Sequence, residues 1–491
     1  MITFRAKDGV LDYVQSLYAN AKKNPQNAKK HAQKVVDTYL GMVEEVLTQA
    51  IISGNERRGM GGYALMLKSL ARKSPQITDK RLRLHSLLSK KMMQPLSIWE
   101  KGSNFTGLPS YVRINHDHYQ VGYSIDKSLL ESDDIIRDIW ERESEKVLNR
   151  YPDIKDIDRD VSIAPADFQI TPINMDSLEN RLRSLLDAFD PDISIEKADL
   201  RELISAFQVA ILAYHFNGHL VNRLEKKPYG RVYQLGIGIQ NLPKTLRPVI
   251  LNPAHEYDIG SSVFSWRLSM AIKLGLVENN QSSIKASFPA TYEYTTNTKQ
   301  VREAIVTDIA QQPDVIDSVD EISSMVKRAI TALSNGAKMN QGYYFDSRGR
   351  CHRPAIRKIL KNDDVLVSAF QNNQTISAIT EESAVIANAI KDYWKSGGKE
   401  NWSSHPDDLY YKNGAIAMPR LLTFLYQHFE TALMDRFCSL LAEKTENQVI
   451  ARIHDAVVVR EKIPKRTLAT IIQELKREFD LPVLRIDGSA L

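Results

Sequence analysis

The chain has 491 residues, of which 43% are hydrophobic and 25% are charged, and its formal net charge is +5. A chain of this length can bury a large core and is typical of about two to four lobes. No apolar run reaches the length of a membrane span, and the first residues lack a signal-peptide core. Two cysteines support neither a disulfide framework nor a Cys-rich zinc site. We therefore expect a cytoplasmic protein without a membrane partner.

The amino-terminal part of the chain is predicted to be mostly helical. Apolar residues recur at helical spacing over 1–95, 128–151 and 176–225, and alternating residues near 105–125 predict a small β-element. Lysine and arginine dominate the first hundred residues, whereas acids dominate the segment that follows the β-element. A basic surface suits a phosphate backbone, and a solvated helix face explains the same charges equally well.

The pattern changes after residue 225, where glycine-punctuated β-type runs begin. An extended stretch leads to Asp258, and small residues then precede a helix predicted over 263–274. A further helix is predicted over 317–338, with acids early and basic residues late. One face of this helix is expected to carry Lys327, Thr331, Ser334 and Lys338, and an adjoining apolar stripe to carry Val326, Ile330, Leu333 and Ala337.

Near the carboxyl end, His454 and Asp455 interrupt a run of β-branched residues within 451–460. The flanking residues predict two strands, so the dipeptide is expected at a hairpin tip. A lone aspartate at such a tip is ordinarily a turn residue. Together with Asp258, however, it supplies a pair of carboxylates that can hold two Mg²⁺ ions during phosphoryl displacement. A lysine such as Lys327 on a helix facing that pair would neutralise triphosphate charge.

Several segments between residues 229 and 491 resemble, in the same order, motifs of family A polymerases. This family includes bacterial DNA polymerase I and the phage-type single-subunit RNA polymerases. The segments are the GR…QNLP residues within 230–243, the stretch around Asp258, VKRAITALSNGAK at 326–338, FDSRGRCHRP at 345–354, AIAMP at 415–419, and RIHDAVVV at 452–459 with the helix and strand predicted after it. The FDSRGR residues also resemble an Asp-x-x-Gly-Arg element that precedes the first catalytic aspartate in the RNA polymerases.

The resemblance implies an α+β fold: a right-hand polymerase with an antiparallel palm sheet, helical fingers and a helical, thumb-like amino-terminal region. The expected boundaries are 1–225 for the thumb-like region, 226–290 for the first part of the palm, 291–345 for the fingers, and 346–491 for the second part of the palm with its closing hairpin.

The resemblance also implies roles for individual residues. Asp258 and Asp455 would be the catalytic residues and would bind the two Mg²⁺ ions. Nucleoside triphosphate would be bound by Lys327, Arg328, Thr331 and Asn335. The nucleic acid would be contacted by Arg231, Gln240, Asn241, Arg348, Arg350 and His454. The implied partners are a DNA or RNA primer–template, nucleoside triphosphates and an accessory protein subunit.

Five positions depart from the pattern of the DNA-synthesising members, among them Asn413 and Ala417 in the AIAMP region. Val263 occupies the place of a glutamate that blocks the ribose 2′-hydroxyl, Asn335 the place of a tyrosine, and Ala456 the place of an acid. We expect DNA synthesis without a proofreading exonuclease. The alternatives are a single-subunit DNA-directed RNA polymerase and a nucleic-acid-binding replication protein with a decayed palm. The compact size fits an enzyme encoded by a phage, plasmid or other mobile element and acting in the host cytoplasm.

Overall fold

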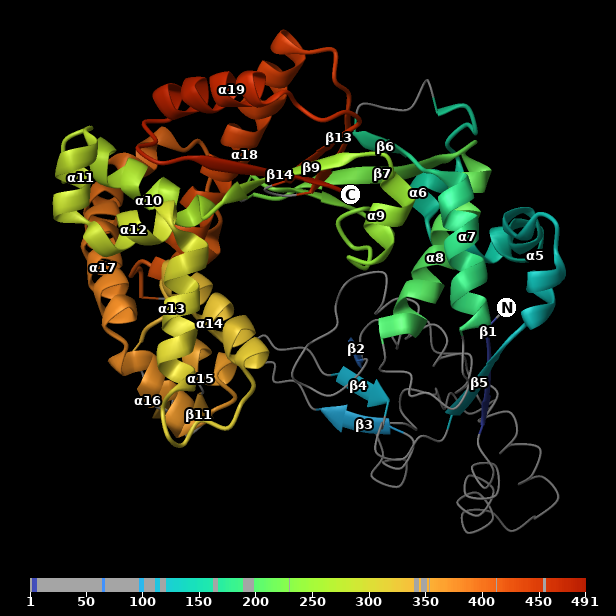
Figure 1. The fold of residues 1–491 in the computed structure, drawn as a ribbon, viewed down its shortest axis with the longest axis horizontal. Coiled ribbons are helices and arrows are strands. Elements are labelled where there is room, and N and C mark those ends of the chain that lie inside the picture. The colour runs from blue at the N-terminus through green and yellow to red at the C-terminus, as the bar shows by residue number, and fades with distance from the viewer. Residues whose placement is uncertain are drawn as a thin grey trace. The chain divides into compact units, whose positions relative to one another are not determined.

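The computed structural model describes residues 2–6, 64–66, 97–100, 111–114, 121–161, 167–188, 198–228, 230–339, 344–345, 351–352, 354–411, 413–453 and 456–491. Helices predominate over small antiparallel sheets in these ranges, which confirms the predicted α+β class (Figure 1). The chain divides into two compact units: residues 1–224, 234–252 and 491 form the first, and residues 225–233 and 253–490 the second. The division into thumb-like region, palm and fingers stays a prediction.

Strands occur in the first unit where helix was predicted. The segments 2–6 and 64–66 fall within the range 1–95 but are extended. In the first of them, ITFRA, the apolar Ile2, Phe4 and Ala6 alternate with polar residues, as is typical of a strand. The other residues of that range lie outside the described part of the chain. The β-element near 105–125 is confirmed. The strands are β1 (Ile2–Ala6) paired with β5 (Val121–Ile125), and β2 (Ala64–Met66), β3 (Ser97–Glu100) and β4 (Tyr111–Ile114) in the order β2-β4-β3.

The rest of the first unit is built around a buried helix, α8 (Ala198–His215), which packs against α5 and α7. The helical prediction for 128–151 is confirmed, but that for 176–225 is wrong beyond residue 215. Asn217 adopts a left-handed conformation with φ 50°, which ends the helix and lets the chain continue as a strand. The other elements are η2 (Lys127–Glu131), α5 (Ile135–Leu148), α6 (Pro152–Lys155), β6 (Phe168–Pro172), α7 (Met175–Asp187) and α9 (Leu246–Leu251). The strands β7 (His219–Lys226) and β8 (Val232–Gln234) each include residues assigned to both units.

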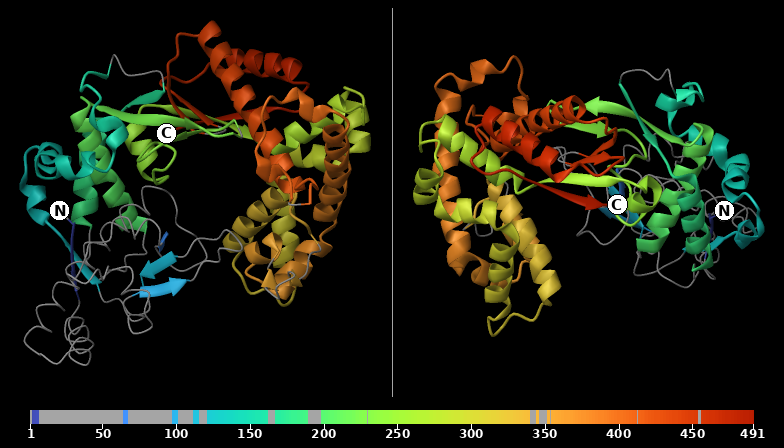
Figure 2. Two further views of the ribbon diagram at one scale, coloured as in Figure 1. Left: turned by 180° about the vertical axis from the view of Figure 1, so that it is seen from behind. Right: turned by 45° about the horizontal axis from the view of Figure 1, so that its top comes forward.

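A four-stranded antiparallel sheet lies in the second unit, and its strand order is β12-β13-β9-β14. Two helices cover one face, on which Tyr257 and Ile259 are buried together with Phe437 and Leu475. Figures 1 and 2 show the C-terminal helix α19 along this side of the strands. The elements are β9 (His255–Gly260), α18 (Met418–Lys444), β12 (Val449–Ile453), β13 (Ala456–Val459), α19 (Lys465–Glu478) and β14 (Arg485–Ala490). The predicted strands on both sides of residues 454–455 are therefore confirmed.

Helices form the remainder of the second unit. The predicted helix at 263–274 is confirmed as α10, and the one at 317–338 as α14, although α14 ends at Ser334. None of the described helices combines the length and apolar character that crossing a bilayer requires. The elements are α10 (Ser262–Lys273), α11 (Gln281–Ser287), α12 (Pro289–Thr296), α13 (Thr298–Ala310), α14 (Val319–Ser334), β10 (Tyr344–Phe345), β11 (Cys351–His352), α15 (Ala355–Ile359), α16 (Asp364–Asn372), α17 (Gln374–Lys395), η4 (Gly398–Asn401) and η5 (Asp407–Leu409).

Candidate active site

Asp258 is an exposed carboxylate in the middle of β9. Its neighbours Tyr257 and Ile259 are both 3% exposed and anchor the strand in the core beneath α18 and α19. Because successive side chains of a strand point to opposite faces, Asp258 lies on the face that these helices leave uncovered. Its register partners are Ala456 on β13 and Asp487 on β14. Directly opposed residues share a face, so Asp487 adds a carboxylate to the face of Asp258.

His454 and Asp455 lie outside the described residues, as do Arg348 and Arg350. The strands on either side of His454 and Asp455 are described: β12 ends at Ile453, and β13 begins opposite it at Ala456. Ala456 follows Asp455 in the chain and is the register partner of Asp258. The roles assigned to these four residues remain predictions.

A sharp turn joins the strand of Asp258 to helix α10. Ser261 forms this turn in the left-handed region, with φ 53°, where a side chain costs about 1–2 kcal/mol. Its hydroxyl is hydrogen-bonded to that of Thr298 at the start of α13. Phe264, on the first turn of α10, packs in one apolar cluster with Ala329 of α14. The strand carrying Asp258 is thus connected, through α10, to the packing of α14.

Helix α14 separates apolar and basic residues onto different faces. Ile322, Val326 and Ile330 are buried, whereas Lys327 and Arg328 are exposed. Within the described part of the chain, neither basic side chain is held in an ion pair. The helix begins with a capping box, in which Ser318 and Glu321 satisfy each other's backbone N–H groups. Its exposed face can therefore present two cations to an anionic ligand.

Other residues predicted on the face of α14 behave differently. The Thr331 hydroxyl donates to the Lys327 carbonyl at 2.9 Å, and the Asn335 amide donates to the Thr331 carbonyl at 3.0 Å. Both side chains thus support the last turns of their own helix. Two expectations are wrong: Ser334 is buried, and Lys338 lies beyond the end of the helix. Gly336 ends the helix with φ 85°, a conformation that favours glycine.

Arg267 on α10 fixes the carboxyl end of α14. This side chain is 1% exposed, and its guanidinium donates to the carbonyls of Ser334 at 2.5 Å and of Ser383 at 2.8 Å. Burial lowers the pKa of Arg267 to about 10. The partial negative charge at the carboxyl end of α14 favours a cation there. Gly336 lies against Pro419 and Leu422, so the same end of α14 also packs on the start of α18.

Arg231 is held by a buried carboxylate on α18. Its Nε and Nη2 donate to the two oxygens of Glu430, at 2.6 and 2.9 Å, and the Glu430 side chain is 1% exposed. Burial lowers the pKa of Arg231, but the hydrogen bonds and charge of Glu430 outweigh it and hold this pKa above its ordinary value. Tyr426 donates its phenol proton to Glu430 at 2.5 Å. Ser262, the first residue of α10, must therefore donate to Tyr426, at 2.6 Å.

Gln240 and Asn241 shape a turn in the first unit. The Gln240 side chain accepts from the backbone N–H of Gln234 at 3.1 Å, and the Gln234 side chain accepts from that of Gln240 at the same distance. The Asn241 amide donates to the Gly236 carbonyl at 3.0 Å. These hydrogen bonds give both residues a local structural role; their predicted contact with a duplex stays a prediction.

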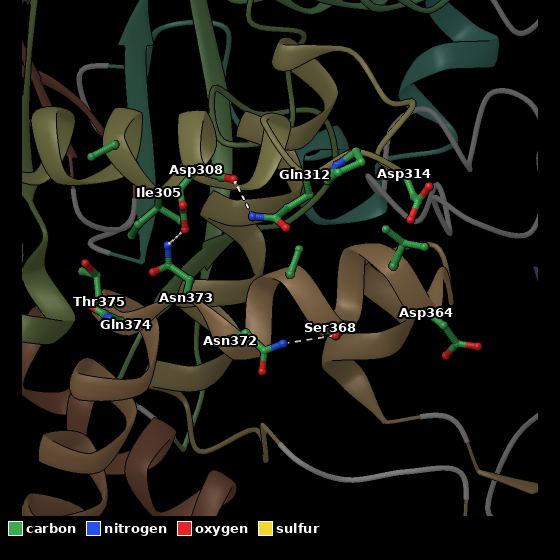
Figure 3. A pocket seen from close by; sticks show the side chains of 14 residues that line it. Ile305, Asp308, Gln312, Asp314, Asp364, Ser368, Asn372, Asn373, Gln374 and Thr375 are labelled. Carbon is green, nitrogen blue, oxygen red and sulfur yellow. Dashed lines mark hydrogen bonds between the residues drawn. The ribbon is translucent and has the colours of Figure 1, made fainter.

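A cavity of about 870 Å³ lies between α13 and α16 and reaches the start of α17 (Figure 3). Figure 3 shows Asp308, Asp314 and Asp364 at its edge, with the Asn373 amide donating to Asp308 at 2.6 Å. None of the predicted site residues lines it. Three carboxylates would repel a triphosphate, so this cavity does not suit the predicted nucleotide.

The donor chemistry of the sheet face suits a hard divalent cation. Carboxylate oxygens are the ligands that Mg²⁺ prefers, and Mg²⁺ is commonly held by one or two carboxylates together with substrate phosphates. Among the described residues, no three His, Cys, Asp or Glu side chains gather in an arrangement that would hold a metal by themselves. Asp258 and Asp487 provide carboxylates on this face, and Asp455 lies outside the described residues.

Comparison with known proteins finds similarity to solved structures. The chain is similar to the POL domain of Pol1 from M. smegmatis in complex with DNA primer-template and dNTP, with 12% sequence identity and a TM-score of 0.37. The match covers 74% of this chain and 66% of the other, so this chain spans just under two thirds of that neighbour's length. No family model and no curated protein matches it. A functional conclusion therefore rests on the residues of this chain.

Four residues with a part in this arrangement were not found from the sequence. Glu430 and Tyr426 are four residues apart on α18, a spacing that could have indicated a shared partner. Asp487 alternates with the apolar Ile486, which could have indicated an uncovered sheet face. Arg267 gave no signal, because a basic residue among apolar helix positions is ordinarily solvated.

The predicted site residues are divided between the two units. The second unit contains Asp258, Lys327 and Arg231, whereas Gln240 and Asn241 belong to the first.

Proposed function

We propose that this protein is a template-directed nucleic-acid polymerase that transfers nucleotidyl groups from nucleoside triphosphates. The observation that carries the proposal is the exposed Asp258 on an antiparallel sheet, in the same unit as the exposed Lys327 and Arg328 of α14. Helix α10 follows the strand of Asp258 and packs against α14, which supports a fixed relation between the acidic and basic groups. A carboxylate pair with a basic helix is what nucleotidyl transfer from a triphosphate requires.

In this reaction the primer 3′-hydroxyl oxygen bonds to the α-phosphorus, and the bond from that phosphorus to pyrophosphate breaks. Two Mg²⁺ ions, held by Asp258 and Asp455, would stabilise charge on the attacking and leaving oxygens. Lys327 and Arg328 would bind the triphosphate and neutralise the departing pyrophosphate. Thr331 and Asn335 would border the base or sugar.

Contacts to the primer–template are proposed for six residues. Arg231, Gln240 and Asn241, which belong to the GR…QNLP segment, would contact the primer–template. Arg348, Arg350 and His454 would add contacts from the segments outside the described residues. Because arginine donates in a planar fork, each arginine would neutralise a phosphate and restrict its position.

The choice of sugar has two candidates. DNA synthesis is favoured by the order of the motifs along the chain, which resembles the order in the DNA-synthesising members of the family. RNA synthesis is favoured by Val263, which packs as an apolar residue against the cluster shared by α10 and α14. An apolar side chain held in this way has no carboxylate to oppose a ribose 2′-hydroxyl.

The test is primer extension by the purified protein with Mg²⁺, offering dNTPs and NTPs separately on DNA and RNA templates. The comparison variant is Asp455→Asn, and the matched control is Asp435→Asn, an exposed aspartate on α18 that is ion-paired with Arg452. Extension by the wild type and the control, with its loss in Asp455→Asn, supports the proposal, and the accepted nucleotide identifies the sugar. Intact nucleic-acid binding without synthesis under any of these conditions would instead identify a replication protein with a decayed palm.

A further inference from the structure

One guanidinium, that of Arg267, connects three helices of the second unit. Arg267 lies on α10, and its side chain is buried. Its Nη2 donates to the carbonyl of Ser334, the last residue of α14, and its Nη1 donates to the carbonyl of Ser383 on α17. Helix α17 itself packs against both α10 and α14. The end of α14 is therefore bonded directly to the helix that follows the strand of Asp258.

The carboxyl end of α14 depends on Arg267 for one of its hydrogen bonds. The last four carbonyls of a helix have no partner within the helix itself. In α14, the carbonyls of residues 331–333 accept backbone N–H groups from residues 335–337. The carbonyl of Ser334 accepts instead from the Arg267 guanidinium. Arg267 thus completes the cap of α14 from a neighbouring helix, and its positive charge suits the partial negative charge of this helix end.

The charge of Arg267 is unfavourable for stability in this place. Among the described residues no carboxylate pairs with it, and burial is the cause that lowers its pKa. Its Nε is also buried and has no hydrogen-bond partner within the same part of the chain. A buried charge without a counter-charge destabilises a fold. Stability alone therefore gives no reason for an arginine at this position, whereas control over the position of α14 does.

The position of α14 matters because this helix carries Lys327 and Arg328. Lys327 lies seven residues before Ser334, which is two turns or roughly 10 Å along the helix. On the other side of the contact, α10 begins four residues after Asp258. A shift at the Arg267 contact would therefore move the basic side chains relative to the strand of the carboxylate. Misplacement of a binding group by about 1 Å can lower a rate by about 100-fold.

We propose that Arg267 is a positioning residue for nucleotide binding. By capping α14 from α10, it holds Lys327 and Arg328 in place relative to the strand of Asp258. Arg267 itself contacts no nucleotide, because its side chain is buried. This inference rests on the proposed function and deepens it, since it assigns the precision of triphosphate binding to a side chain that lies outside the site.

The experiment measures steady-state primer extension by the full chain over a range of nucleotide concentrations, together with the Kd for primer–template. Arg267→Met removes every donor, whereas Arg267→Lys keeps a donor and the charge. Ser269→Ala is the matched control, because Ser269 is also buried on α10 and donates to the carbonyl of Phe479 at the end of α19. Arg267→Met is expected to raise the nucleotide KM about 10-fold or more. Its kcat and primer–template Kd, and the KM of the other two variants, should stay within about 3-fold of the wild type.

Two further measurements show whether Arg267 acts through α14. The nucleotide KM of the double variant Arg267→Met/Lys327→Ala should rise by less than the product of the two single effects, because both changes affect the same helix. Hydrogen exchange of the amides of residues 331–337 requires no activity and should be faster in Arg267→Met than in the wild type. In Ser269→Ala it should be unchanged.

The outcomes separate this inference from the proposed function. If the wild type extends a primer and Arg267→Met keeps its nucleotide KM within about 3-fold, Arg267 is a structural residue only, and the polymerase proposal stands. An equal rise in Ser269→Ala, or single effects that multiply in the double variant, would overturn the inference in the same way. If Arg267→Met does not fold, Arg267→Gln replaces it under the same limits. A wild type that extends no primer would contradict the proposed function, and this inference with it.

Discussion

The second unit uses charge in two contrasting ways, in a buried network and on exposed faces. The buried network consists of Arg231, Glu430, Tyr426 and Ser262, in which the Glu430 carboxylate accepts hydrogen bonds from both Arg231 and Tyr426. The exposed faces carry Asp258 on the sheet and Lys327 on α14. A buried charge without its partner is costly, whereas an exposed charge loses little on folding. The network should therefore govern stability, and the exposed faces should govern substrate binding and chemistry.

The largest effect on stability is expected for Glu430→Gln. This change leaves the Arg231 guanidinium, which is only 22% exposed, without a balancing charge and should lower the free energy of unfolding by about 3–5 kcal/mol. The measurement is the urea unfolding midpoint, converted to free energy through the slope of the transition. Glu478→Gln is the matched control, because Glu478 binds Arg436 through both oxygens but at the surface. Its expected cost is at most about 1 kcal/mol. Equal losses in both variants would remove the distinction between buried and exposed charge.

Lys327→Ala should leave stability unchanged within about 0.5 kcal/mol and weaken nucleotide use. Removing one charge-assisted contact to the triphosphate should cost about 1.5–3 kcal/mol, which raises KM or lowers kcat/KM by roughly 10- to 100-fold. Steady-state extension over a range of nucleotide concentrations measures this change. Lys299→Ala is the control, since Lys299 is an exposed lysine on the neighbouring helix α13. A comparable loss in the control variant would show that general basic charge, and not this position, is responsible.

Ser261 offers a smaller test where the strand of Asp258 turns into α10. Ser261→Gly and Ser261→Ala both lose the hydrogen bond to Thr298, but only glycine relaxes the left-handed backbone. We expect the glycine variant to be more stable than the alanine variant by about 1 kcal/mol, measured by urea unfolding. Equal stabilities would mean that the turn stores no strain.

The smallest effect concerns His428, whose ring nitrogen Nε2 lies 3.1 Å from the Pro228 carbonyl. Burial lowers the pKa of His428 below its ordinary value of 6.5. As the pH falls below 6.5, His428 is therefore protonated in the unfolded chain before it is protonated in the folded protein. The free energy of unfolding decreases over this range and levels off once the pH is below the lowered pKa of the folded state. His428→Gln should lack this part of the acid-induced loss. Unfolding free energies measured between about pH 7.5 and 5 test it, and parallel curves for the two proteins would contradict it.

The sequence predicted most of the elements that carry the exposed charges. The β-branched residues around 454–455, the apolar stripe of α14 and the helix after Asp258 correspond to observed elements because their periodicity is local. The prediction for Lys338 was wrong because the helix ends at Ser334, and the prediction for Ser334 was wrong because its side chain is buried. The network of Arg231 and Glu430 spans 199 residues, and the pairing of Asp258 with Asp487 depends on strand register. No local pattern contains such information.

The most direct test of the account is the single-turnover rate of primer extension by Asp258→Asn, with the unfolding free energy of the same variant measured in parallel. Because Asp258 is exposed, its stability should stay within about 0.5 kcal/mol of the wild type. Loss of a metal-binding carboxylate removes several kcal/mol of transition-state stabilisation, so the rate should fall by about 1,000-fold or more. A rate within about 10-fold of the wild type, in a folded variant, would contradict the assignment of this sheet face as the active site.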